Sequence, residues 1–250
     1  MDVTVKAIWE YETSPGIEYF VPENTNYCEI SGSFKEIQGE VFIGAFYEGR
    51  QVLGIHAGAF KDRTGITGVY LLDGILAIED EAFSGCTSLE VVDIPSTVVR
   101  IGASAFKGCE SLKEIILPES LTTIEEGAFE GCTGLTDIAI PESVTSMDTS
   151  VFENDTALEA VSWSSSLTAI PQYTFSGCTS LRLIDLPDNL SAIGKYAFNN
   201  CDSLKTFTMP DSVTTMGESA FYDCDALTEI QIPKDLQSGS WIFQKCDNLK

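Results

Sequence analysis

The chain has 250 residues, 44% of them hydrophobic, and carries 38 acidic against 14 basic side chains, a net charge of −24. This length and composition suffice for one large hydrophobic core and differ from those of a disordered chain. The acidic excess argues against nucleic acid and anionic membrane surfaces as partners, because their phosphates would be repelled. No apolar run approaches the roughly 18 residues needed to cross a bilayer, so membrane insertion is not expected.

The first part of the chain, residues 1–18, is predicted to be a strand followed by a linker. Residues 1–10 alternate apolar and polar side chains, with Val3 and Val5 on one face, and residues 13–16 are typical of a turn. Residues 1–20 lack the basic start and apolar core of a signal peptide, so export would require a leader that was removed or that lies upstream.

Residues 19–60 are predicted to form an N-terminal cap and a first coil. Residues 27–31 and 40–43 are two short apolar-alternating runs separated by Gly32 and Gly39. We expect them to pair as a β-hairpin-like cap, because the end of a stacked structure otherwise exposes an unpaired strand. Gly49 is placed where the first coil must turn.

Residues 61–250 repeat with a period of 23, which indicates a stacked repeat architecture of about nine coils. In one copy, Leu112, Ile115 and Leu117 predict a short strand, which Pro118 ends because proline cannot donate to a continuing ladder. A return path follows, and the recurring Ala-Phe pair predicts a short helical turn that closes the coil. The phenylalanines of this pair are Phe60, Phe83, Phe106, Phe129, Phe152, Phe175, Phe198, Phe221 and Phe243.

Seven of the eight cysteines occupy one slot of successive repeats, and Asp155 fills that slot in another. Equivalent side chains in stacked coils are parallel and about 4.8 Å apart, whereas a disulfide requires two Cβ atoms that point toward each other. We therefore predict a ladder of buried free thiols that act as small apolar residues. No C-x-x-C motif is present and His56 is the only histidine, so neither a metal site nor a cofactor is expected.

The repeated pattern L-x-x-I-x-I-P-x-S-V-T-x-I-x-x-x-A-F-x-x-C resembles the BspA-like, or treponemal-type, leucine-rich repeat family over about residues 40–250. Membership implies a leucine-rich-repeat solenoid of the β-dominated α/β class, right-handed, with a parallel sheet on one face. The family occurs mainly in surface and secreted proteins of host-associated bacteria, and its members are linked to adhesion. Residues 1–10 also resemble the last strand of small β-repeats that precede such regions in longer surface proteins. The coil at residues 144–163 departs from the pattern, with Trp163 and Ser164 in place of the apolar-proline pair.

Binding is expected on the outward columns of the sheet, because side chains there are not needed for the core. An apolar centre beside carboxylates would suit a protein or glycoprotein partner with a basic rim and an apolar middle, on host or neighbouring cells. The alternative is that these are ordinary solvated strand positions. The candidate ligand-binding residues are Tyr70, Val91, Asp93, Glu114, Ile116, Asp137, Leu183 and Asp185.

Catalysis is not expected. Any Ser-His-Asp or Cys-His arrangement would have to use His56, and neither a phosphate-binding loop nor an H-E-x-x-H motif is present. We therefore predict a monomeric, non-enzymatic binding module of an extracellular or cell-surface protein, with a structural spacer as the alternative function. Serine and threonine pairs such as Thr122-Thr123 are expected to form a ladder on the return path rather than a glycan site.

Overall fold

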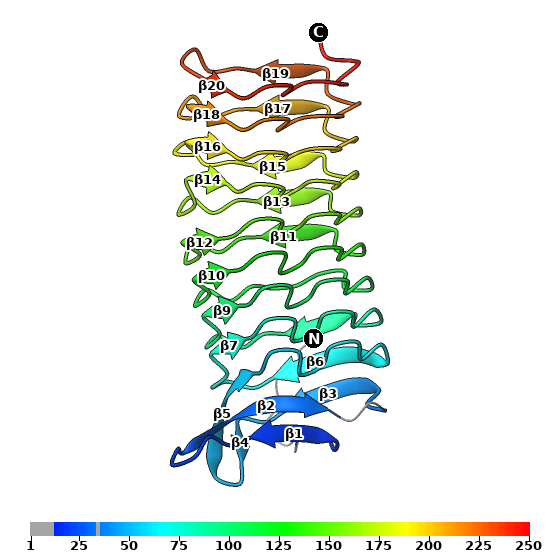
Figure 1. The fold of residues 1–250 in the computed structure, drawn as a ribbon, viewed down its shortest axis with the longest axis vertical. Helices are drawn as coiled ribbons and strands as arrows, with labels where there is room; N and C mark the ends of the chain where they lie inside the picture. Colours follow the sequence, from blue (N-terminus) through cyan, green and yellow to red (C-terminus); the bar gives the residue numbers. More distant parts are fainter. Residues whose placement is uncertain (1–12, 34–35) are drawn as a thin grey trace, which may run out of the picture.

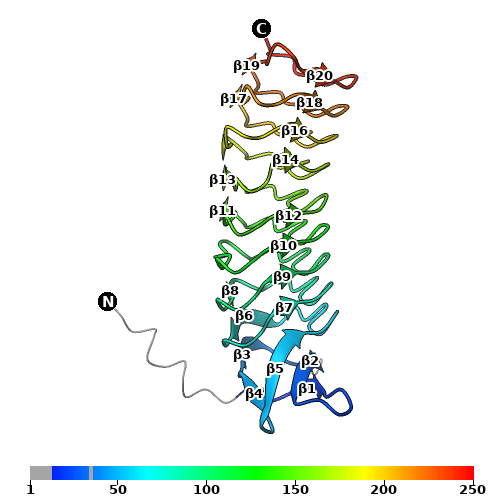
Figure 2. The same cartoon turned by 90° about the vertical axis from the view of Figure 1, so that its left-hand side faces the viewer.

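The computed structural model describes residues 13–33 and 36–250, and within these ranges the chain forms strands and turns but no helix. The strand predicted over residues 1–10 lies outside the described residues. The coils stack into a nearly straight column, with the ends of the repeat region at opposite ends (Figures 1 and 2). Accordingly, the described residues contain no helix long and apolar enough to cross a membrane.

One face of the column is formed by the strands that precede the recurring proline of the repeat, or the residue in its place, and we call it the front ladder. These strands are parallel and pair in three groups, β3-β6-β8, β11-β13-β15 and β17-β19. Their bounds are β3 (Gly39–Ile43), β6 (Ile66–Leu71), β8 (Val91–Asp93), β11 (Asp137–Ala139), β13 (Ala160–Ser162), β15 (Leu183–Asp185), β17 (Thr206–Thr208) and β19 (Glu229–Gln231).

A second parallel ladder, the return ladder, runs up the neighbouring face (Figure 2). It contains the serine and threonine pairs, as predicted: Thr123 pairs with Ser146, and Ala192 pairs with Thr215. Its strands are β5 (Arg50–Ile55), β7 (Ala77–Ile78), β9 (Arg100–Ile101), β10 (Thr123–Ile124), β12 (Ser146–Met147), β14 (Ala169–Ile170), β16 (Ala192–Ile193), β18 (Thr215–Met216) and β20 (Gln237–Ser238).

The core between the ladders is organised by the phenylalanine of each turn. The nine rings form one continuous stack, with centroids of neighbouring rings 5.0–5.8 Å apart and ring planes within 28° of each other. Eight of the nine side chains are fully buried. Burying one phenylalanine stabilises by about 1.5–3 kcal/mol, so the stack is a large part of what holds the coils together.

The Ala-Phe turns are not helical, which corrects the prediction of short helical turns. The N–H of Cys86 donates within the turn to the Phe83 carbonyl at 3.1 Å, whereas the N–H of Phe83 donates to the Ala105 carbonyl of the next coil at 2.7 Å. Alternate N–H groups of the turn thus donate to carbonyls of the next coil, whereas in a helix they would donate to carbonyls of the same helix. Positive φ angles at Glu81 (55°) and Gly85 (74°) also interrupt any helical path.

The N-terminal cap contains strands at the predicted places, but they pair differently. β2 (Tyr27–Ser33) pairs antiparallel with β1 (Ile17–Phe20) and parallel with β5, while β3 joins the front ladder through β6. The predicted hairpin between residues 27–31 and 40–43 is therefore wrong: each run instead begins one of the two ladders. A second hairpin joins β4 (Phe46–Tyr47) to β5, and Glu48 and Gly49 at its turn both have positive φ angles.

The eight cysteines are free and buried, which confirms the predicted thiol ladder. The structure adds a polar role that the sequence did not predict. Each thiol in the repeat slot donates to the carbonyl of the phenylalanine in the preceding coil, for example Cys109 Sγ to Phe83 O at 3.3 Å. The same bond joins Cys178 to Phe152 at 3.0 Å and Cys224 to Phe198 at 3.0 Å. The thiols therefore link the coils as well as fill space.

Candidate binding surface

The predicted outward residues lie on the solvent face of the front ladder, because side chains alternate between the two faces of a strand. On β8, Val91 and Asp93 are exposed while Val92 between them is buried. The register also brings equivalent positions together, with Tyr70 beside Asp93 and Ala139 beside Ser162. The predicted columns are therefore present as rows of side chains within each paired group of strands.

The front ladder is interrupted in the middle of these columns. Among the described residues no strand is assigned over residues 113–117, so one group of strands ends at β8 and the next begins at β11. Ile116 lies in this gap with its side chain 83% exposed. Its neighbours Ile115 and Leu117 are buried, so this coil keeps its core contacts although it leaves the ladder.

A shallow depression lies on each side of Ile116. The first, of about 290 Å³, is lined by Tyr70, Val91, Asp93 and Glu114 among others, and the second, of about 300 Å³, by Glu114, Asp137 and Ala139 among others. Ile116 and Glu114 line both depressions. The structure thus brings six of the eight predicted residues together, and we call this set the front patch: Tyr70, Val91, Asp93, Glu114, Ile116 and Asp137.

The other two predicted residues lie apart from the front patch. Leu183 and Asp185 are on β15, which pairs with β13, so Ala160 and Ser162 separate them from β11. Leu183 is 64% exposed but lines neither depression. The spacing of the repeat alone could not separate the two sets, because every coil offers the same outward positions.

Tyr70 is held at one end of the front patch by two residues that the sequence analysis did not select. Its ring stacks on Phe42 at 4.8 Å, and its hydroxyl donates to Glu40 Oε1 at 3.2 Å. Burial and the Glu40 carboxylate raise the pKa of Tyr70, so the hydroxyl remains a donor. Both partners lie on β3, and the alternating pattern of residues 40–43 was the available signal for their outward direction.

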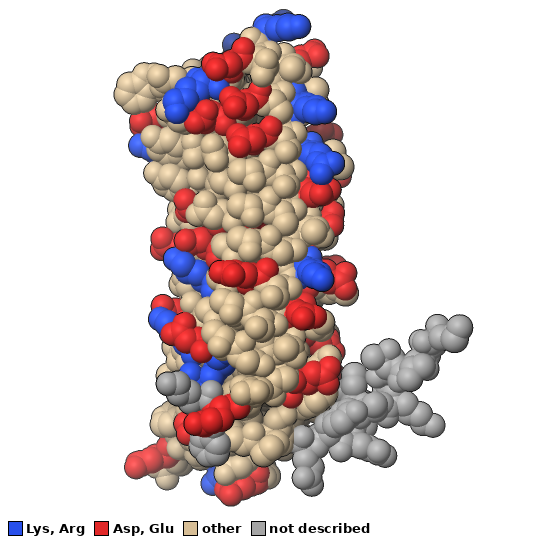
Figure 3. Space-filling model, turned by 90° about the vertical axis from the view of Figure 1, so that its right-hand side faces the viewer, with Lys and Arg blue, Asp and Glu red and all other residues tan. Residues whose placement is uncertain are grey.

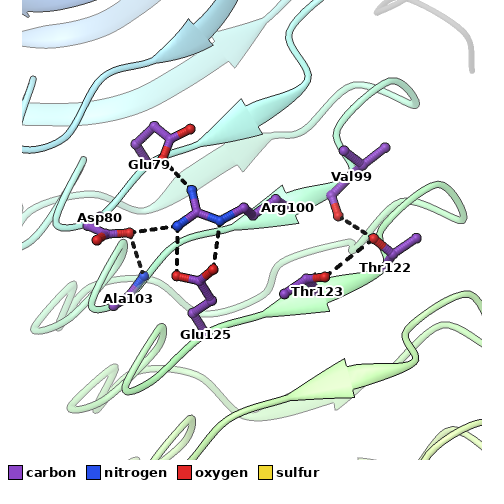
Figure 4. Close-up of polar contacts among 8 residues, drawn as sticks. All are labelled: Glu79, Asp80, Val99, Arg100, Ala103, Thr122, Thr123 and Glu125. Carbon is purple, nitrogen blue, oxygen red and sulfur yellow. Dashed lines mark hydrogen bonds and ion pairs between the residues drawn. The ribbon is translucent and has the colours of Figure 1, made fainter.

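A different polar cluster lies on the return ladder, where Arg100 joins three carboxylates from neighbouring coils (Figure 4). Its guanidinium forms a bidentate pair with Glu125, with both bonds at 2.7 Å, and further ion pairs with Glu79 and Asp80. Asp80 also accepts from the Ala103 N–H at 3.1 Å. Because the donors of Arg100 are used within the chain, we interpret this cluster as an inter-coil link and not as a ligand site.

Most basic residues on the turn side of the column are paired in the same way. Lys61, Lys107, Lys195 and Lys245 each form an ion pair with a carboxylate of a neighbouring coil at 2.7–3.1 Å. Figure 3 shows this side, with the few basic side chains lying beside acidic ones. No group of three or more His, Cys, Asp or Glu side chains within residues 13–33 and 36–250 is arranged to hold a metal ion.

The stacked coils, each with its alternating strand and Ala-Phe turn, define the protein as a leucine-rich repeat solenoid. The family of the BspA type leucine rich repeat region matches six copies, over residues 53–182 and 150–250. The chain belongs to this family, which confirms the resemblance seen in the repeat pattern. Members of this repeat class are in general interaction or surface modules and not enzymes.

Several solved structures of leucine-rich repeat proteins are similar to this chain. A leucine rich repeat protein of T. pallidum is 26% identical, with a TM-score of 0.73 over 78% of this chain and 91% of that one. A leucine-rich repeat protein of Eubacterium ventriosum is 17% identical, with a TM-score of 0.50 over 94% of each chain. A leucine rich cell surface protein of Faecalibacterium prausnitzii is 19% identical, with a TM-score of 0.40 over 96% of this chain and 93% of that one. No curated protein matches the sequence.

Proposed function

We propose that the chain is a non-enzymatic adhesion module of an extracellular or cell-surface protein, and that its front patch binds a protein or glycoprotein on host or neighbouring cells. The observation that carries this proposal is Ile116, a large aliphatic side chain that is 83% exposed between two depressions. Exposed apolar side chains gathered at a hollowed surface are typical of interaction sites.

The charge of the front patch supports the same function. Asp93, Glu114 and Asp137 surround the apolar centre and form no ion pair with any basic side chain in the described residues. Complementary charge mainly steers association and sets specificity. A partner with basic residues around an apolar segment would fit this surface.

The alternative is a spacer that holds another domain away from the cell. A spacer would need only the stacked column, and its outward rows would carry no apolar cluster. The placement of Val91 and Ile116 in one depression favours binding over this alternative.

The proposal is tested by binding of the purified chain to an array of host matrix proteins and mucin-type glycans, at physiological and at high salt. The informative variant is Ile116→Glu, which changes an exposed side chain and leaves the core intact. Its matched control is Gln231→Glu, which adds the same charge at an exposed position of the same column on β19. We expect saturable binding that Ile116→Glu abolishes and Gln231→Glu retains. Absence of binding to every component, or equal binding by both variants, would contradict the proposal and favour the spacer.

A further inference from the structure

We propose that the segment bound at the front patch is a basic amphipathic α-helix that lies along the axis of the solenoid, across successive coils. This inference rests on the proposed function and adds the shape and chemistry of the partner. It is carried by four features of the patch: its repeat distance, its straightness, the two depressions beside Ile116, and its unpaired carboxylates.

The repeat distance of the coils is close to the pitch of a helix. Hydrogen-bonded strands of successive coils lie about 4.8 Å apart, and an α-helix repeats about every 5.4 Å, so the mismatch is only about 0.6 Å per coil over the few coils of the front patch. A helix along the column can therefore place one side chain on each coil, from positions i, i+4, i+7 and i+11. An extended strand repeats its same-face side chains about every 6.6 Å, so it would lose register with the coils within two steps.

The straightness of the surface favours the same partner. Figures 1 and 2 show a column whose front ladder runs without strong curvature over the coils that contribute the front patch. A helix is a straight rod over this length, so it can contact Tyr70, Ile116 and the coils between them without bending.

The two depressions suit the interlocking of side chains between a helix and a ridged surface. Ile116 projects between them, and each is lined partly by aliphatic or aromatic groups, such as Val91 on one side and Ala139 on the other. Apolar side chains from two successive turns of the partner helix would occupy the depressions, with Ile116 between them. This is the arrangement by which helices pack ridges into grooves.

The charges select the polar face of the partner. Asp93, Glu114 and Asp137 border the depressions, whereas the lysines of the turn side are already paired with carboxylates of neighbouring coils. Lysine or arginine residues that flank the apolar stripe of the helix would reach these three carboxylates. An acidic helix would meet like charges at the same positions.

The experiment uses three synthetic 18-residue peptides and the purified chain. The first, made of Leu, Lys and Ala, has leucines at i, i+4, i+7 and i+11 with lysines beside them. The second has the same composition with leucines at alternate positions, and the third has Glu in place of Lys. Binding is measured by fluorescence anisotropy, and helix formation by circular dichroism at 222 nm, where a chain without helix in its described residues gives a weak background.

We expect the first peptide to bind with a gain of helical signal, and the other two to bind at least tenfold more weakly. The variant Ile116→Asn, which leaves the charge unchanged, should weaken the first peptide at least tenfold, while Thr208→Asn on β17 should change its affinity less than twofold. Glu114→Gln combined with Asp137→Asn should weaken binding and reduce its dependence on salt.

Equal binding of the helical and alternating peptides, or no gain of helical signal, would overturn the inference, as would no binding of any peptide. These results are distinct from failure of the proposed function. If the peptides fail while a ligand from the array still loses binding to Ile116→Glu, the front patch remains the binding surface and only the helical partner is wrong.

Discussion

Asp155 occupies the slot that holds a cysteine in seven coils, and we expect the substitution Asp155→Cys to stabilise the protein. The Asp155 side chain is fully buried, and its Oδ1 accepts from the Cys132 N–H at 2.8 Å, but its Oδ2 has no hydrogen-bond partner. A cysteine at position 155 would have the surroundings of Cys132 and Cys178 in the neighbouring coils, whose thiols donate to the phenylalanine carbonyl of the preceding coil.

The expected gain in the free energy of unfolding follows from the unpartnered oxygen of Asp155 and from the protonation of its carboxyl group. A buried polar atom without a partner costs about 1–3 kcal/mol. Burial also raises the pKa of Asp155 well above its usual value, while the unfolded chain keeps a pKa of about 3.9. The free energy of unfolding is therefore highest below about pH 4. It falls as the pH rises from there toward the pKa of Asp155 in the folded state, by up to about 1.4 kcal/mol per pH unit.

We therefore expect Asp155→Cys to raise the free energy of unfolding by about 1–3 kcal/mol at pH 4, where only the cost of the unpartnered oxygen is removed, and by at least about 1 kcal/mol more at pH 7. Urea denaturation under reducing conditions, followed by tryptophan fluorescence, is a suitable assay because Trp163 is buried and packs on Phe175 at 5.8 Å in the same region. The converse variant Cys109→Asp should lose stability at pH 7 and recover part of it at pH 4. A gain for Asp155→Cys that is absent at pH 7, or equal at both pH values, would refute the reasoning.

Three further predictions concern the contacts between coils. Arg100→Met should lower the free energy of unfolding by about 1–2 kcal/mol in urea denaturation, because three carboxylates lose a partly buried partner. This loss should be smaller in 1 M salt, and a loss that does not depend on salt would contradict an electrostatic origin. Phe106→Ala should lower the free energy of unfolding by about 3–5 kcal/mol. Phe243→Ala should lower it clearly less, because Phe243 is partly exposed and stacks on one ring, whereas Phe106 stacks on two. Equal changes in melting temperature for the two variants would contradict this. Cys246 should react first with a thiol reagent, because it is 8% exposed in the last coil, whereas Cys109 is fully buried and its burial raises the pKa of its thiol. Mass spectrometry that finds Cys109 labelled as early as Cys246 would contradict this.

The repeat architecture was predictable because each coil repeats the same short-range pattern. The alternation around Ile115 specifies a strand, Pro118 ends it, and 23-residue spacing brings equivalent side chains into register. The buried thiols followed from the same spacing. Their hydrogen bonds did not, since the acceptor is a carbonyl 26 residues earlier that no pattern of side chains reveals.

Features that depend on competition between backbone partners were not predictable. Residues 27–31 and 40–43 have the composition of a hairpin, but they do not pair with each other. Each pairs with a strand of a ladder instead, β2 with β5 and β3 with β6. The Ala-Phe turns have good helix formers, yet the N–H of Phe83 is needed by the next coil. Local propensity yields in both cases to the stacking of coils.

The candidate site was predicted as a row of positions and not as a patch. Outward columns follow from alternation, but the same alternation runs through residues 113–117, so it gave no sign that the ladder is interrupted there. It also gave no sign that Ala160 and Ser162 on β13 separate the front patch from Leu183 and Asp185. The stack of Phe42 on Tyr70 joins residues 28 positions apart, outside the 23-residue period, and so carried no signal in the repeat.

The most direct test of the account is the dissociation constant for a ligand found on the array, measured for the unmodified chain, Ile116→Glu and Gln231→Glu. Burial of an isoleucine contributes about 1.5–3 kcal/mol, so its loss corresponds to roughly a 10- to 100-fold change in the dissociation constant. We predict a weakening of at least tenfold for Ile116→Glu and of less than twofold for Gln231→Glu. Equal dissociation constants for all three proteins would show that the front patch is not the binding surface.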